Sequence, residues 1–298
     1  MRALAEQILR FARTDSNVLI SGETGTGKNL VARELHLRGK RAKQPFVTID
    51  CPSLSPTLID SELFGHERGP FTDAVTARAG RFELARSGTV YLDAVSELPL
   101  DAQSKLLRIV EEKRVERLGS QMSVAMEARV VASSGADIET AVRDGRFRQD
   151  LFHRLRVLPL LVPPLRERRD DVLPLARYFA TRAVAGQDRP VPAFSRDATA
   201  ALRDYAWPGN IRELRHVVEV ACQTASHTVM LTDLPDEVLA TPAPADKPLD
   251  RQPTLDDMER RYVAATLRAV HGNQTQAAAR LGISRKALWE RRKRCGID

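Results

Sequence analysis

A glycine-rich segment near the start of the chain, GETGTGKN at 22–29, has the residue types that bind phosphate groups. It follows a short apolar run at 18–21 and precedes a predicted helix, which gives the pattern strand, GxxxxGK, helix. Glycines let backbone N–H groups curl around phosphate oxygens, and the N-terminus of the helix adds positive potential. A lysine at the end of such a loop can reach the β- and γ-phosphates of a nucleotide. We therefore expect a nucleotide site formed by Gly22, Glu23, Thr24, Gly25, Thr26, Gly27, Lys28 and Asn29.

A carboxylate is also needed at the end of a neighbouring strand, to hold the Mg²⁺ ion that accompanies a triphosphate. The run TVYLD at 89–93 supplies it as Asp93. Asn29 stands where a Ser or Thr usually contacts the metal ion, and Ala94 stands where a glutamate often polarises the attacking water. Because alanine cannot act as a base, the sequence predicts binding of ATP and Mg²⁺ and leaves open whether the protein is an ATPase.

These residues need a sheet to position them. Five short apolar runs rich in β-branched residues alternate with helical stretches, which is typical of buried parallel strands with helices on both faces. From 170 to 239 the strand pattern stops and helical patterns take over. The predicted fold class is therefore α/β, a parallel sheet followed by a small helical subdomain. The predicted strands lie at 18–21, 46–49, 89–92, 129–133 and 156–161.

The positive charge is concentrated at the C-terminal end. Residues 251–298 hold 11 Lys and Arg against 5 Asp and Glu, whereas the whole chain holds 46 against 39. A basic module beside a nearly neutral body indicates a polyanion as partner, although a solvated basic tail would carry the same charge. The segment TPAPADKPLDRQP at 241–253 contains four prolines and is interpreted as a linker before this module.

Composition excludes several classes of protein. No apolar run approaches the ~20 residues that span a bilayer, and the N-terminus has no apolar signal core. Cys51, Cys222 and Cys295 form neither a disulfide framework nor a zinc pattern. Aromatic residues make up only 5%, which disfavours a β-sandwich. We expect a cytoplasmic protein with no membrane partner.

Longer segments follow one another in an order typical of one known family. They are SGETGTGKNLVARELH (21–36), SELFGHERGPFTDA (61–74), GRFELARSGTVYLD (80–93), SELPLDAQSKLLRIVEE (96–112), FRQDLFHRL (147–155), PPLRERRDDV (163–172), WPGNIREL (207–214) and GNQTQAAARLGISRKAL (272–288). Over essentially its whole length the chain resembles bacterial enhancer-binding proteins, the AAA+ P-loop NTPases that activate the sigma-54 form of RNA polymerase. The last segment resembles their Fis-type helix-turn-helix.

The resemblance implies roles for three arginines. In the family, the segment FRQDLFHR faces the nucleotide of the neighbouring subunit, so Arg148 and Arg154 match arginine fingers. A planar, always-charged guanidinium suits γ-phosphate oxygens, although a surface arginine or a strut to a helix end is the simpler alternative. Arg212 matches the sensor arginine that links the helical subdomain to the nucleotide. The resemblance also implies self-assembly into a ring, a hexamer in the family.

Some family positions carry other residues here. The polymerase-contacting loop, GAFTGA in the family, is GPFTDA at 69–74, which keeps the contact pair Phe71 and Thr72 but adds a proline and an aspartate that should stiffen the loop. The asparagine that follows the second strand is Asp50, and the first sensor asparagine is Gly135. We expect Asp50 to lie near the γ-phosphate and to orient water in place of the missing glutamate. Alternatively, it is protonated or turned away, because the triphosphate repels a carboxylate.

The C-terminal segment predicts three helices. The first begins near 254, and the second follows Asn273, which is expected to cap it. The third runs over 285–294 after a tight turn at 282–284, with Ser284 expected as its cap. In a helix-turn-helix the third helix enters the major groove by its N-terminal residues. A basic helical hairpin that binds no DNA is the alternative. The residues expected to face bases or phosphates are Ser284, Arg285, Lys286, Trp289, Arg292 and Lys293.

The predicted organisation is an AAA+ α/β nucleotide-binding subdomain at 1–169, a helical lid at 170–240, the linker at 241–253 and a Fis-type DNA-binding domain at 254–298. The predicted function is a bacterial transcription regulator, cytoplasmic and nucleoid-associated, that binds ATP and double-stranded enhancer DNA and acts on sigma-54 RNA polymerase as a ring.

A second hypothesis stays open, in which the protein senses a nucleotide and binds DNA without remodelling the polymerase. A replication loader shares the AAA+ plan but does not explain the FTDA segment or the C-terminal module. Members of this family usually carry a receiver or ligand-sensing domain first. We therefore expect either that the chain is a fragment or that a partner protein controls it.

Overall fold

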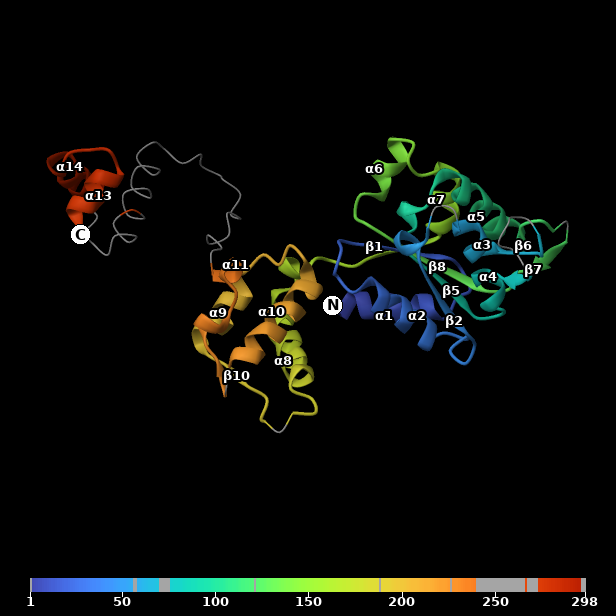
Figure 1. The fold of residues 1–298 in the computed structure, drawn as a ribbon, viewed down its shortest axis with the longest axis horizontal. Helices are drawn as coiled ribbons and strands as arrows, with labels where there is room; N and C mark the ends of the chain where they lie inside the picture. The colour runs from blue at the N-terminus through green and yellow to red at the C-terminus, as the bar shows by residue number, and fades with distance from the viewer. Residues whose placement is uncertain are drawn as a thin grey trace. The chain divides into compact units, whose positions relative to one another are not determined.

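The computed structural model describes residues 2–55, 58–69, 76–120, 122–187, 189–225, 227–239, 266 and 273–295. The chain divides into two compact units, 1–243 and 244–298 (Figure 1). The first unit contains the sheet and the helical subdomain, and the second contains the C-terminal helices. Among the described residues, no helix has the length and apolar character needed to cross a membrane.

A five-stranded parallel sheet forms the centre of the first unit. Its strand order is β2-β5-β8-β1-β9, so the phosphate-loop strand β1 lies between β8 and β9. This confirms the predicted parallel α/β fold. The last strand begins two residues later than predicted, because Arg156 still caps the preceding helix with its N–H on Phe152 O. The strands are β1 (Val18–Ser21), β2 (Phe46–Asp50), β5 (Thr89–Asp93), β8 (Arg129–Ser134) and β9 (Leu158–Leu161).

Helices cover both faces of this sheet. Successive side chains of a strand point to opposite faces, so Leu92 packs in one apolar cluster while Tyr91 packs in the other. The Tyr91 face is covered by α1 and α2, and the Leu92 face by α5 and α7 (Figure 1). The helices of this part are α1 (Arg2–Ala12), α2 (Lys28–Leu37), α3 (Ile59–Phe64), α4 (Arg81–Leu84), α5 (Leu100–Glu112), α6 (Ile138–Arg143) and α7 (Gln149–Leu155).

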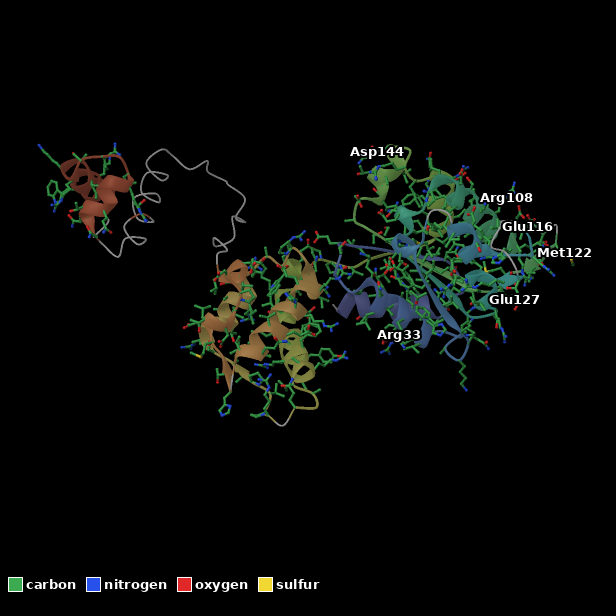
Figure 2. The ribbon with its side chains drawn as sticks, viewed as in Figure 1. Arg33, Arg108, Glu116, Met122, Glu127 and Asp144 are labelled. Carbon is green, nitrogen blue, oxygen red and sulfur yellow. The ribbon has the colours of Figure 1, made fainter. Side chains whose placement is uncertain are left out.

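Two short antiparallel hairpins extend from this part, β3 (Gly65–His66) with β4 (Arg78–Ala79), and β6 (Arg114–Glu116) with β7 (Ser123–Ala125). The hairpins are joined, since Arg117 pairs with Glu67 at 3.1 Å. Met122, just before β7, projects from the second hairpin and is 80% exposed (Figure 2).

The first hairpin brackets the predicted polymerase-contacting loop. Phe71 and Thr72 themselves lie outside the described residues.

The helical subdomain packs around Trp207, which is fully buried and donates its indole N–H to Leu202 O at 2.9 Å. The prediction that strands end before this part was wrong in one respect. A short parallel pair, β10 (Ala193–Phe194) and β11 (Thr228–Val229), joins the segments that precede α9 and follow α10. The helices are α8 (Val172–Ala183), α9 (Arg196–Asp204), α10 (Asn210–Thr224) and α11 (Asp236–Leu239).

The second unit contains α13 (Gln274–Arg280) and α14 (Arg285–Cys295), which pack through Ala277, Ala278 and Leu288. Both predicted caps are present. The side chain of Asn273 accepts from the N–H groups of Thr275 and Gln276, and that of Ser284 accepts from Ala287 at 3.1 Å. The helix predicted to begin near 254 lies outside the described residues, apart from position 266.

Candidate functional site

The phosphate loop connects β1 to α2 and depends on glycine. Gly25 and Gly27 have φ of 79° and 99°, in the left-handed region that favours glycine. At Gly25 a side chain would also collide with the helical subdomain, since its Cβ would lie 2.3 Å from Gly209 O. The loop therefore takes its turn and touches the helical subdomain only because these positions lack side chains.

Lys28 is the cation of this loop. Its Nζ donates to Gly22 O at 2.8 Å and to Glu23 O at 3.0 Å. These two hydrogen bonds fix the side chain against the phosphate loop. Burial lowers the pKa of Lys28, Asp93 opposes this shift, and the positive charge of Arg212 adds to it. A half-buried ammonium group beside an acid at the start of a helix is suited to bind an anion.

A cleft of about 640 Å³ opens beside this loop. It brings together most of the predicted nucleotide residues, including side chains from the ends of three strands and from α10. The predicted residues that line it are Thr24, Gly25, Gly27, Lys28, Asn29, Asp50, Asp93 and Arg212, together with Ala94 and Gly135.

Glu23 takes a different place from the one predicted. Its carboxylate forms two hydrogen bonds to Arg166, at 2.6 and 2.8 Å, and accepts a third from the Asn210 side chain at 3.1 Å. The hydrogen bonds from Arg166 lower the pKa of Glu23 to about 2. The side chain of Glu23 thus ties the phosphate loop to the helical subdomain, and Glu23, Gly22 and Thr26 do not line the cleft.

On the acidic side of the cleft, Asp93 is held by two hydroxyls that the sequence analysis missed. Ser133 donates to Asp93 Oδ1 at 2.6 Å, and the Tyr91 hydroxyl lies 3.0 Å from the same oxygen and 2.9 Å from Asn29 Oδ1. Burial raises the pKa of Tyr91, so its phenol keeps the proton. The contact between Tyr91 and Asp93 could have been predicted from the sequence, because residues 91 and 93 of a strand share a face.

Ala94 and Gly135 leave the cleft without the amide and carboxylate side chains of the family pattern. Ala94 has φ of 53° and donates its N–H to Ser133 Oγ at 3.1 Å. A Cβ at Gly135 would lie 2.5 Å from Asp137 Oδ1, so the Asp137 carboxylate occupies that space. Asp137 and Glu97 also line the cleft, and neither was predicted. The cleft therefore keeps carboxylates although position 94 has none.

The two predicted finger arginines lie away from this cleft. The Arg148 guanidinium bonds to Asp150 at 2.8 and 3.1 Å and to Ser104 at 3.1 Å, and it lines a separate surface cavity. Arg154 pairs with Glu111 at 2.7 Å. Neither arginine lines the cleft of its own chain.

Arg212 reaches the cleft because α10 begins against the phosphate loop. The N–H of Ile211 donates to Gly25 O at 2.9 Å. Arg215 lines the same cleft one helical turn later and was not predicted, although its spacing from Arg212 indicates a shared helix face.

Four of the six predicted DNA-facing residues lie at the start of α14. Ser284 caps the helix, and Arg285, Lys286 and Trp289 are exposed, Trp289 by 58%. A solvent-facing cation pair and indole suit contacts with a nucleic acid. The side chains of Arg292 and Lys293 lie outside the described residues.

Known families match three successive parts of the chain. The sigma-54 interaction domain matches residues 1–161. The chain belongs to the family of sigma-54 activators. In the same chain the AAA+ ATPase lid domain matches 166–250, and the Fis family of bacterial regulatory proteins matches 254–294. The family predicted from the sequence segments is confirmed.

Individual regulatory proteins resemble the chain along its length. Regulatory protein AtoC of Escherichia coli is 39% identical over 100% of this chain and 66% of its own length. Response regulator protein PilR of Pseudomonas aeruginosa is 40% identical over 100% of this chain and 68% of its own. The chain thus spans about two thirds of the length of these relatives.

Among solved structures, NtrX of Brucella abortus has a TM-score of 0.75 and 33% identity over 99% of this chain and 67% of its own. NtrX was also solved in complex with ADP and in complex with ATP.

Proposed function

We propose that this sigma-54 activator is an ATP-binding transcription regulator that acts on sigma-54 RNA polymerase from enhancer DNA. The observation that carries the proposal is the cleft beside the phosphate loop, where Lys28, Asp93 and Arg212 converge. Backbone N–H groups at the start of α2 and two cations from separate elements supply what a triphosphate needs. The complexes of NtrX with ADP and ATP support the same assignment.

The donor atoms of the cleft fit Mg²⁺. Asp93 offers a carboxylate and Asn29 an amide oxygen, and Mg²⁺ prefers oxygen ligands, usually from one or two protein groups plus phosphates. Asp93 would hold the ion with Asn29 beside it, and the ion would neutralise charge on the β- and γ-phosphates. Lys28 and Arg212 bind and orient the triphosphate.

Hydrolysis by this cleft is slow in our proposal. The methyl group of Ala94 cannot take a proton from water, and the loss of a positioned base costs a factor on the order of 10²–10⁴. Asp50, at the end of the neighbouring strand, lines the cleft and orients water in place of the missing base.

Ring assembly completes the site in our proposal. Arg148 and Arg154 lie outside their own cleft, which fits a role at the nucleotide of a neighbouring subunit, as in the hexamers of the family.

α14 binds double-stranded DNA in the major groove. Phe71 and Thr72 contact the polymerase. A regulator of this kind acts in the bacterial cytoplasm, at the nucleoid.

The departures at Ala94 and Gly135 favour a second candidate function, a regulator that binds ATP and DNA without remodelling the polymerase. In vitro transcription from a sigma-54 promoter that carries the enhancer separates the two. ATP-dependent open-complex formation supports the activator. Specific DNA binding and ATP binding without open complexes would support the second candidate, and absence of ATP binding would overturn both.

A further inference from the structure

Four side chains from three elements meet in a hydrogen-bonded cluster beneath the cleft. The Tyr91 hydroxyl lies between Asn29 on α2 and Asp93 at the end of β5, 2.9 and 3.0 Å from their Oδ1 atoms, and its single proton can be donated to either oxygen. Ser133 on β8 completes the cluster at 2.6 Å from Asp93 Oδ1. Tyr91 is 1% exposed and Ser133 is fully buried, so water does not compete for these bonds.

The hydrogen bonds are directed at one oxygen of the carboxylate. Ser133 donates its only proton to Asp93 Oδ1 and accepts the N–H of Ala94, so its proton is committed to the carboxylate. Tyr91 approaches the same Oδ1. Among the described residues, no hydrogen bond reaches Oδ2 of Asp93. One oxygen is therefore fixed by the protein while the other stays available to the cleft.

The tyrosine ring is anchored independently of its hydroxyl. It stacks on Phe46 with ring centroids 6.0 Å apart and an interplanar angle of 13°, and it belongs to the apolar cluster beneath α2. Because the ring is fixed, the hydroxyl has a defined position, and Tyr91→Phe removes the hydroxyl while keeping the packing.

We propose that Tyr91 and Ser133 are the positioning residues of the Mg²⁺ site, holding the Asp93 carboxylate so that one oxygen faces the cation, while Tyr91 couples it to Asn29 of the phosphate-loop helix. The proposal rests on the proposed ATP–Mg²⁺ site. Neither side chain lines the cleft. Each acts through Asp93, and the effect should appear only where the cation contributes to binding.

The test is the affinity of the full chain for a fluorescent ATP analogue, measured once with Mg²⁺ and once with EDTA. The ratio of the two affinities isolates the contribution of the cation. We expect Tyr91→Phe and Ser133→Ala each to reduce this ratio about tenfold and to leave the EDTA affinity unchanged, because a hydrogen bond to a charged group is lost. The Mg²⁺ concentration for half-maximal binding should rise in parallel.

Tyr178→Phe is the matched control, since it removes an exposed tyrosine hydroxyl on α8 that interacts with Arg182. It should leave the ratio unchanged. An unchanged ratio in both Tyr91→Phe and Ser133→Ala would overturn the positioning role, and so would an equal loss of affinity with Mg²⁺ and with EDTA. A wild-type protein that binds no nucleotide would overturn the proposed function itself.

Discussion

Glu23 and Arg166, 143 positions apart in the chain, form a bidentate ion pair with oxygen–nitrogen distances of 2.6 and 2.8 Å. Glu23 belongs to the phosphate loop, and Arg166 lies just after the last strand of the sheet. Asn210, at the start of α10, adds a third hydrogen bond to the same carboxylate. The phosphate loop is thereby fastened to the helical subdomain.

The ion pair predicts a pH-dependent stability. Arg166 lowers the pKa of Glu23 from 4.5 to about 2, so the stabilisation is complete above pH 4.5 and is lost as the pH falls towards 2. Glu23→Gln should lower the free energy of unfolding by about 1 kcal/mol at pH 7, since both partners are partly exposed. Urea unfolding at several pH values measures this difference, which should shrink below pH 4.5.

Glu219→Gln is the control for this experiment, because it breaks an exposed pair with Arg215 one helical turn away. Its effect at pH 7 should be smaller. A difference between wild type and Glu23→Gln that stays constant from pH 7 to pH 3 would contradict the assignment.

Lys28→Ala should abolish ATP binding, because the phosphate loop loses its cation. Isothermal titration calorimetry measures the loss directly. Lys43→Ala, an exposed lysine, should bind ATP as the wild type does. Equal ATP affinity in Lys28→Ala and wild type would remove the loop from the site.

Removal of residues 251–298 should abolish specific DNA binding and leave the first unit folded, since the chain divides at 243 into separate compact units. The deletion removes 11 Lys and Arg against 5 Asp and Glu, and with them the phosphate contacts that dominate affinity. Gel-shift titration against the enhancer measures binding. A truncated protein that shifts this DNA with unchanged affinity would show that the C-terminal unit is not the DNA-binding part.

Arg148→Ala should weaken nucleotide-dependent oligomers and leave the monomer folded. Arg146→Ala is a close control, because each arginine pairs with an aspartate two positions away, Asp150 and Asp144 respectively. Sedimentation velocity with ATP should show smaller assemblies for Arg148→Ala only. If both variants sediment as the wild type does, Arg148 has no role between subunits.

Local sequence pattern predicted the parts of the fold that depend on neighbouring residues. The strand over 18–21, the helix starting at Lys28 and the caps at Asn273 and Ser284 follow from periodicity, glycine spacing and capping chemistry. The start of the last strand was predicted two residues too early. Arg156, the first residue of the predicted strand, is the C-cap of the preceding helix.

The remaining contacts depend on tertiary approach. Tyr91 meets Asn29 across 62 positions, and Glu23 turns away from the cleft only because Arg166 and Asn210 fold against it. Asp137 occupies the space beside Gly135 because no side chain at that position excludes it. The residue pattern of one strand or helix does not predict which side chains of distant segments contact it.

ATP turnover by the purified protein, with and without enhancer DNA and beside the variants Ala94→Glu and Asp50→Asn, tests the account most directly. We predict that the wild type binds ATP and hydrolyses it slowly, that Ala94→Glu raises turnover by a factor on the order of 10²–10⁴, and that Asp50→Asn removes the residual activity. Brisk hydrolysis by the wild type that survives Asp50→Asn would contradict it.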